Sequence, residues 1–394
     1  MYNLSNHYEN IYQYLTTIIA DPRVLYLYPF GSTQPENIEI IRNDIDPPEH
    51  RGPLFICFDQ EPLNYAYNKN FFDYITQNTM GPYVLVNTER DSTERDRICK
   101  EYGFVDINYF FHIFAAHDWY RGHEYMPGII APRSRTLKKT YISFNRLTSN
   151  ERIYRSLFVN ELHKANLLDH GYVSFSRDCP DGGAFDTNLL QGIANQNIDP
   201  ALANEAITNI NQLPDLRIDF EGQHIPNQSM LLSPLDKLME SFIFVVTETC
   251  YWQSKTHLTE KIFKPIVLRM PFLLLGCAHN LAYLRSYGFK TFSDFWDESY
   301  DDMEDPIQRM QAVTEILQDI TTMSQTQQLA MLRDMEPILE HNYNLFNSPN
   351  FIKTEWEYLL KNLKETAESF YIPAPYTLDV NTKQRIPIAG PIES

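Results

Sequence analysis

The chain has 394 residues, 43% of them hydrophobic, which suits two buried cores better than one. Its 51 acidic and 33 basic residues give a formal charge of −18, which repels polyanions and argues against non-specific nucleic-acid binding. No apolar run approaches the roughly 18 residues of a membrane helix. The polar N-terminus lacks the basic start of a signal peptide, and the five cysteines are widely spaced. We therefore expect a cytoplasmic protein with reduced thiols.

The first third of the chain alternates between strand-like and helix-like stretches. Apolar runs rich in Val, Ile, Phe and Tyr lie at 23–28, 54–58 and 83–87. Polar stretches of helical character lie between them at 70–77 and 93–102. This alternation predicts a largely parallel sheet with covering helices. We assign residues 1–135 to a first α/β domain, which ends in a linker at 126–138 rich in proline and basic residues.

The segment 111–124 gathers histidines and acids at the end of this first domain. His112, His117 and His123 lie close in sequence to Asp118 and Glu124. Their spacing fits no standard zinc pattern, so we predict no metal site. We expect a loop that contacts an acceptor, with His117 or Asp118 as a possible base and Trp119 or Tyr120 stacking on a sugar. A histidine-rich surface between domains is the alternative.

A second alternation follows and predicts a second α/β domain at 139–345. Its expected strands are 140–144, 171–176, 242–247 and 272–275, and its expected helices are 149–165, 258–269, 280–287 and 307–342. The polar stretch 177–234 predicts loop and short helix. Residues 346–394 complete the chain with a helix at 353–369 and an extended, proline-containing tail.

The most specific stretch is 242–264, FIFVVTETCYWQSKTHLTEKIFK. A buried strand ends near Glu248, and a helix opens at Thr259, which suits an N-cap. Glu260 complements the positive end of the helix dipole, whereas Lys261 opposes it. An anion bound at this helix start explains the lysine, so we predict a diphosphate site, with Glu260 accepting hydrogen bonds from ribose hydroxyls. A capped helix with solvated charges is the alternative.

A second basic cluster lies in 141–155, YISFNRLTSNERIYR. Arg146 follows a strand at its carboxyl end, where open α/β sheets bind ligands. Arg152 and Arg155 are three residues apart and share a helix face. For Arg146 we favour a phosphate-binding role. For Arg155 we favour a surface ion pair with Glu151 or Glu161.

The stretch around Glu248 resembles the donor-binding motif of the family 10 α-1,3-fucosyltransferases. Glu248 matches the glutamate of Phe-Glu-Asn-Ser, and Thr259, Glu260 and Lys261 match Thr-Glu-Lys. The chain departs from the family pattern at four positions, which leaves the sugar open between fucose and others: Thr247, Thr249, Cys250 and His257.

The resemblance implies a GT-B fold, in which two Rossmann-like domains face each other across a cleft and helices complete the C-terminus. It implies an inverting, metal-independent transfer from a nucleoside diphosphate sugar, GDP-linked in that family, to a hydroxyl of a glycan or another acceptor. Glu248, Thr259, Glu260, Lys261 and Arg146 would bind the donor.

The resemblance also suggests a catalytic base. Family 10 enzymes carry a Glu-x-Pro segment after a strand, and the stretch 55–62, FICFDQEP, is similar, although Glu61 here directly precedes Pro62. Glu61 would take the proton of the acceptor hydroxyl. A solvated loop carboxylate is the alternative.

Motifs of other enzyme classes are missing from the sequence. It contains no Walker A loop, no GxGxxG and no GxSxG. Two further hypotheses remain beside a transferase: a non-catalytic protein that binds sugars or nucleotides, and a virion-associated structural protein on a degenerate transferase fold.

Overall fold

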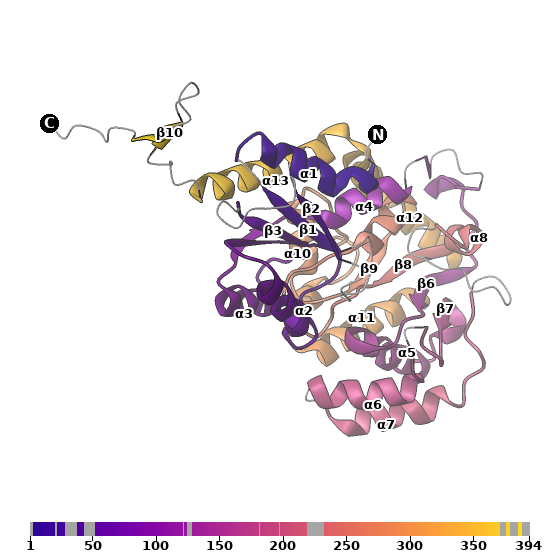
Figure 1. The fold of residues 1–394 in the computed structure, drawn as a ribbon. Coiled ribbons are helices and arrows are strands. Elements are labelled where there is room, and N and C mark those ends of the chain that lie inside the picture. Colours follow the sequence, from indigo (N-terminus) through magenta and orange to yellow (C-terminus); the bar gives the residue numbers. More distant parts are fainter. Residues whose placement is uncertain are drawn as a thin grey trace.

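The computed structural model describes most of the chain, and the structural statements below concern only the described residues. These are 3–19, 22–27, 38–42, 52–120, 122–123, 128–180, 182–196, 198–218, 232–370, 376–378 and 385–387. They form two main β-sheets with helices packed around them (Figure 1). The predicted α/β fold class is confirmed. Among the described helices, none has the length and apolar character needed to cross a membrane.

The first sheet has the strand order β2-β1-β3-β4-β5. Its strands are β1 (Arg23–Leu27), β2 (Ile38–Arg42), β3 (Leu54–Phe58), β4 (Tyr83–Asn87) and β5 (Val105–Asn108). All are parallel except β2, which runs antiparallel to β1 at one edge. The three strands predicted from apolar runs are confirmed. The two edge strands are missing from the prediction, and β5 has a single buried residue, so its sequence carries little apolar signal.

Helices cover both faces of the first sheet. They are α1 (His7–Thr16), α2 (Tyr65–Asn78), α3 (Thr93–Tyr102) and α4 (Phe111–Tyr120). Because successive strand residues point to opposite faces, Phe55 packs in a core with α1 and α4, whereas Ile56 packs in another with α2 and α3. A short 3₁₀ turn, η1 (Leu4–Asn6), precedes α1. Asn64 caps α2 by accepting a hydrogen bond from the backbone of Tyr67, so this helix starts earlier than predicted.

Helix α4 corrects the prediction of a loop at 111–124. Its side chains are buried on every side, because the helix lies between two cores. Phe111 and Phe114 pack in a core of the first sheet, whereas Ile113 and Tyr120 pack in the core of the second. The segment is a buried connector and not a histidine-rich surface. Glu124 lies outside the described residues, as do 126–127 of the predicted linker.

The second sheet has the order β7-β6-β8-β9, and all its strands are parallel. The strands are β6 (Lys139–Asn145), β7 (Gly171–Phe175), β8 (Ser241–Thr247) and β9 (Phe272–Leu275), so all four predictions are confirmed. Strand β8 is buried along its whole length, which a continuous apolar run predicts for a central parallel strand.

The helices of this half are α5 (Tyr154–Lys164), α6 (Phe185–Gln196), α7 (Pro200–Ile210), α8 (Leu235–Met239), α9 (Phe263–Val267), α10 (Asn280–Ser286), α11 (Pro306–Thr321) and α12 (Gln325–Asn347). Short 3₁₀ helices are η4 (Pro132–Ser134), η5 (Asn150–Ile153), η6 (Leu168–His170), η8 (Glu260–Ile262) and η9 (Ser299–Asp302).

Two predictions about the helices of this half are corrected. The stretch 177–234 contains two full helices, α6 and α7, while 219–231 lies outside the described residues. The expected helix 307–342 is two helices, because Ser324 forms a capping box that starts α12.

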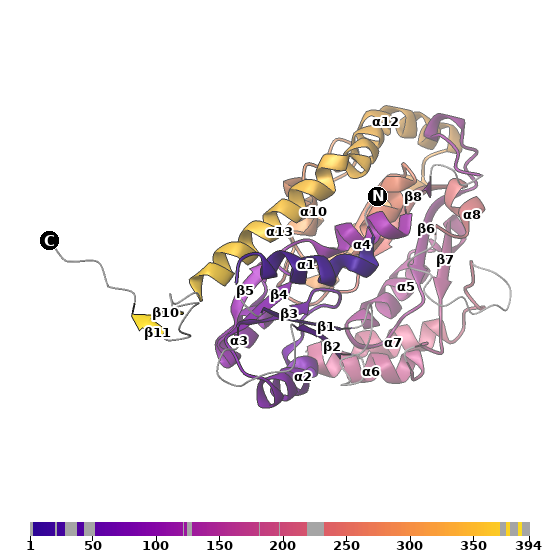
Figure 2. The same cartoon turned by 45° about the horizontal axis from the view of Figure 1, so that its top comes forward.

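The last helix, α13 (Pro349–Ser369), returns to the first sheet. It packs beside α1, as both views show, and beside β5, which is labelled in Figure 2 (Figures 1 and 2). Its residues Leu359, Leu363 and Ala367 are buried in the core that holds α1. In the tail, β10 (Tyr376–Leu378) and β11 (Arg385–Pro387) pair antiparallel, and the remaining residues after 370 lie outside the description.

Candidate functional site

A cavity of about 340 Å³ lies between the two sheets. On the side of the first sheet, its wall comes from the loop after β3 and from α4, with Gln60, Glu61, Pro62, His112 and Trp119. On the other side, it comes from the carboxyl ends of β6 and β8 and from the η8–α9 turn. The volume falls in the range of small-molecule sites, and the strand ends are where open α/β sheets bind ligands.

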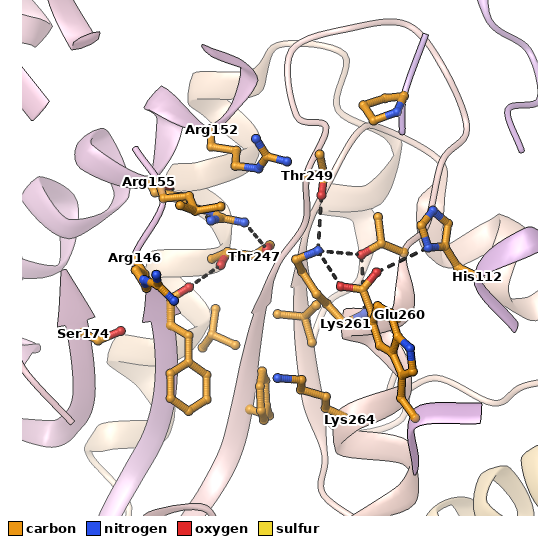
Figure 3. Close-up of a pocket in the computed structure, with 18 of the residues that line it drawn as sticks. His112, Arg146, Arg152, Arg155, Ser174, Thr247, Thr249, Glu260, Lys261 and Lys264 are labelled. Carbon is orange, nitrogen blue, oxygen red and sulfur yellow. Dashed lines mark hydrogen bonds and ion pairs between the residues drawn. The ribbon is translucent and has the colours of Figure 1, made fainter. Parts of the chain in front are cut away.

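The wall from the second sheet is strongly basic. Five cationic side chains line the cavity, against the two carboxylates of Glu61 and Glu260: Arg146, Arg152, Arg155, Lys261 and Lys264. Figure 3 shows the three arginines on one side of Lys261, with Glu260 and His112 on the other. In a chain with a formal charge of −18, such a concentration of positive charge favours a small anionic ligand.

Arg155 corrects the prediction of a surface ion pair. It is buried, and its guanidinium donates hydrogen bonds to the carbonyl oxygens of Leu147 at 3.2 Å, Thr247 at 2.8 Å and Glu248 at 3.1 Å. Burial lowers the pKa of this arginine. The side chain therefore ties the loop after β6 to the end of β8 and forms part of the cavity wall there.

The start of η8 agrees with the sequence prediction. Thr259 is the N-cap, and its Oγ1 accepts a hydrogen bond from the backbone nitrogen of Lys261 at 3.4 Å. The Nζ atom of Lys261 lies 2.9 Å from Oε1 of Glu260, 3.1 Å from Oγ1 of Thr259 and 3.3 Å from Oγ1 of Thr249. About a quarter of the Lys261 side chain, 26%, is exposed, so its charge faces the cavity.

Glu260 is buried between Lys261 and His112. Its Oε1 contacts Lys261, and its Oε2 lies 3.3 Å from Nδ1 of His112, which reaches across from α4. Burial opposes ionisation of Glu260, but the charges of Lys261 and His112 hold its pKa well below the usual value. An ionised carboxylate at this point can accept hydrogen bonds from a ligand.

Lys264 adds a cation that the sequence analysis misses. It lies three residues after Lys261 and lines the same cavity. Burial lowers its pKa to about 8, with the charge of Lys261 acting in the same direction. The three-residue spacing on one helix face is the signal that identifies it.

Glu248 does not line the cavity, which corrects the prediction that it contacts the donor directly. Its side chain is fully buried, and its Oε1 accepts a hydrogen bond from the backbone nitrogen of Thr259 at 3.2 Å. Its Oε2 accepts a hydrogen bond from the hydroxyl of Thr259. Burial raises the pKa of Glu248. The residue thus holds the start of η8 in place and acts on the cavity through Thr259.

Glu61, the predicted base, is one of the residues that line the cavity. It is half-buried in the loop after β3 and lines the cavity from the side opposite the basic wall. His117, the rival base, lies elsewhere. Its ring packs against Phe346 with centroids 4.2 Å apart, and burial lowers its pKa to about 4. Neither His117 nor Asp118 lines the cavity, whereas Trp119 does.

The described residues contain no group of three or more His, Cys, Asp or Glu side chains arranged to hold a metal ion. No protein-family model matches the chain, and no curated protein shows significant similarity to it. The site is therefore interpreted from its own geometry.

Proposed function

We propose that this protein is a glycosyltransferase that moves a sugar from a nucleoside diphosphate sugar to a hydroxyl acceptor. One observation carries the proposal: five cationic side chains line one wall of the cavity, and the carboxylate of Glu61 lies on the opposite wall. The cations can stabilise the charge of a leaving diphosphate, and the carboxylate can take the proton of an acceptor hydroxyl.

Several features support a diphosphate on the basic wall. Arginine binds phosphate through two parallel hydrogen bonds. Arg146 directly follows the carboxyl end of β6 and Arg152 lies on η5, and both line the cavity. Lys261 and Lys264 approach from the η8–α9 turn. These cations can neutralise the leaving group, so we propose transfer without a divalent metal. Glu260 would accept hydrogen bonds from the ribose hydroxyls. The resemblance to family 10 enzymes suggests a GDP-linked donor.

The proposed chemistry is a single displacement with inversion. The acceptor oxygen forms a bond to the anomeric carbon while the bond from that carbon to the diphosphate oxygen breaks. The hydroxyl proton passes to the carboxylate of Glu61, and the electron pair of the broken bond stays on the diphosphate. Arg146, Arg152 and Lys261 stabilise the charge that develops there.

The proposed fold is GT-B, with an acceptor domain at 1–135, a donor domain at 139–345 and a C-terminal segment at 346–394. The presence of both sheets at the cavity supports this division of labour. The acidic surface of the chain favours a neutral acceptor, such as a glycan, over a polyanion.

The decisive experiment is a thermal-shift series with GDP, UDP, CDP and dTDP, each with and without EDTA. Binding at a hundredfold excess over Kd stabilises a protein by about 2.7 kcal/mol, so one of the four should raise Tm, and EDTA should not reverse it. Release of that nucleotide from its sugar conjugate then separates a transferase from a protein that only binds. No stabilisation by any nucleotide would contradict the proposal and would favour a structural role.

A further inference from the structure

A buried carboxylate lies directly behind the cavity wall. Asp59 follows β3, is completely buried, and precedes Gln60 and Glu61, which both line the cavity. Its Oδ1 accepts a hydrogen bond from the hydroxyl of Tyr8 on α1 at 2.7 Å, and its Oδ2 accepts one from the hydroxyl of Tyr109 after β5. Nothing in the proposed transfer uses this carboxylate.

The hydrogen bonds around Asp59 have one consistent direction. Burial and the charge of Asp59 raise the pKa of Tyr8 and Tyr109 well above 10. Both hydroxyls therefore stay protonated, and each donates a hydrogen bond to the carboxylate. His7 is held neutral, because burial lowers its pKa to about 3. Its Nε2 lies 2.7 Å from the hydroxyl oxygen of Tyr109, whose proton is already donated, so this nitrogen carries hydrogen and donates.

The same logic extends to Gln60 on the cavity wall. Its Nε2 donates to the hydroxyl oxygen of Tyr8 at 2.5 Å. The chain of donors therefore runs from Gln60 through Tyr8 to Asp59, and from His7 through Tyr109 to Asp59. Every donor points toward a carboxylate, and aligned hydrogen bonds of this kind strengthen one another.

Burial disfavours the ionised form of Asp59, and the hydrogen bonds that it accepts favour that form. Burial raises the pKa of Asp59 to about 6, while the hydrogen bonds from Tyr109 and Tyr8 and the charge of His112 oppose the rise. The titratable groups that act on it are His7 and Tyr8 on α1, Cys57 on β3, Tyr109, and His112 on α4.

We propose that Asp59 is a positioning residue, which through Tyr8 helps to fix the Gln60 carboxamide at the cavity wall and loosens it when the carboxylate is protonated. A protonated Asp59 must donate its own hydrogen to one tyrosine. With either tyrosine as the acceptor, Tyr8 no longer donates to a charged carboxylate, so the hydrogen bond from Gln60 to its hydroxyl oxygen loses its charge-assisted partner. As a statement about regulation of the site, this inference rests on the proposed function, but its test does not require turnover.

The test follows the side-chain amide signals of Gln60 by NMR, assigned by their absence in Gln60→Met, as the pH is varied. In the wild-type protein these signals should shift with a midpoint near 6, the pKa of Asp59. The shift should disappear in Asp59→Asn. In Tyr8→Phe, Asp59 should still titrate while Gln60 no longer responds. Tyr102→Phe is the matched control, since it removes a similar hydroxyl bond to Asp73, 2.7 Å long and remote from Gln60.

A Gln60 response that persists in Asp59→Asn or Tyr8→Phe would overturn the proposal, as would a wild-type signal that does not change near pH 6. Once a donor is known, nucleotide release should fall as the pH drops through about 6 in the wild-type protein but not in Asp59→Asn. A protein that shows the NMR transition but no turnover with any donor would retain the positioning network and lose the transferase proposal.

Discussion

Lys261 is the residue at which anion binding is most directly tested. It is partly exposed and has Glu260 as an ion-pair partner, yet it faces a cavity with four other cations. A charge-assisted contact is worth about 1.5–3 kcal/mol, which corresponds to roughly ten- to a hundredfold in affinity. We expect Lys261→Ala to weaken nucleoside diphosphate binding by that factor in calorimetric titration. Stability should change less, because Glu260 keeps His112 as a partner.

Lys237→Ala is the matched control for Lys261→Ala. Its side chain is 34% exposed, against 26% for Lys261, and it also lies close to an acidic neighbour, Asp236. It does not line the cavity, so affinity should stay unchanged. Equal loss in both variants would assign the effect to general charge and not to a phosphate contact.

Glu61 is the residue at which proton transfer is tested. Glu61→Gln keeps the size of the side chain and removes its basicity. General-base catalysis contributes about 10²–10⁴ in rate, so turnover should fall by that factor while nucleotide affinity stays near the wild-type value. His117→Ala should retain turnover, because His117 packs against Phe346 outside the cavity. Loss of nucleotide binding in Glu61→Gln would argue against separate donor and acceptor walls.

Asp59 also leaves a signature in overall stability. Its pKa rises from 3.8 in the unfolded chain to about 6 in the folded protein. A raised pKa means that its stabilising contribution is fully present below pH 3.8 and is lost as the pH rises through 6. The shift corresponds to roughly 3 kcal/mol. We expect the difference in unfolding free energy between wild type and Asp59→Asn to change over this window, measured by urea denaturation. A difference independent of pH would contradict the assignment.

At the scale of elements, the loop between β8 and η8 is fastened to the first sheet. Arg90 and Thr256 exchange backbone hydrogen bonds of 3.0 and 2.8 Å. Lys255 is buried, and its Nζ lies 2.9 Å from Oε1 of Glu89 and also donates to the carbonyl oxygen of Leu63. The loop that follows β8 is thereby fixed against the segments that lead from β3 to α2 and from β4 to α3.

The Lys255–Glu89 pair gives a prediction for this loop. Removing one partner of a buried ion pair costs about 3–5 kcal/mol, because the other charge is left without compensation. We expect Lys255→Met to lose that much unfolding free energy in denaturant titrations. The double variant Lys255→Met/Glu89→Gln should recover part of it. The exposed pair Lys353 and Glu357 is the control, and Lys353→Met should have little effect. A small loss in Lys255→Met would show that the pair is solvated.

At the scale of the whole molecule, the two sheets are joined through α4 and α13. Helix α4 contributes side chains to cores on both sides, and α13 carries the C-terminal helices back to α1 (Figure 2). Separate domains usually unfold separately, but a shared buried helix couples their cores. We therefore expect one cooperative transition in calorimetry, with equal calorimetric and van't Hoff enthalpies. Two resolved transitions would show that the coupling is weak.

The sequence by itself determined the elements whose signal is local. The central strands were found from continuous apolar runs, because burial on both faces leaves no polar alternation to interpret. Thr259 was identified as an N-cap because capping depends on neighbouring backbone groups alone. The basic cluster around Arg146 and Lys261 was likewise visible, since strand ends and helix starts can be located from the chain.

Only the tertiary structure decided which of these side chains reach the cavity. Glu248 turns to Thr259 and His117 turns to Phe346, whereas Gln60, His112 and Lys264 face the site. The sequence predicts a loop where α4 forms, because a helix with most of its side chains buried shows little helical periodicity. The carboxylate of Asp59 shows the same limit. Its partners, Tyr8 on α1 and Tyr109 directly after β5, are 51 and 50 residues away in sequence, and long-range packing alone brings them together.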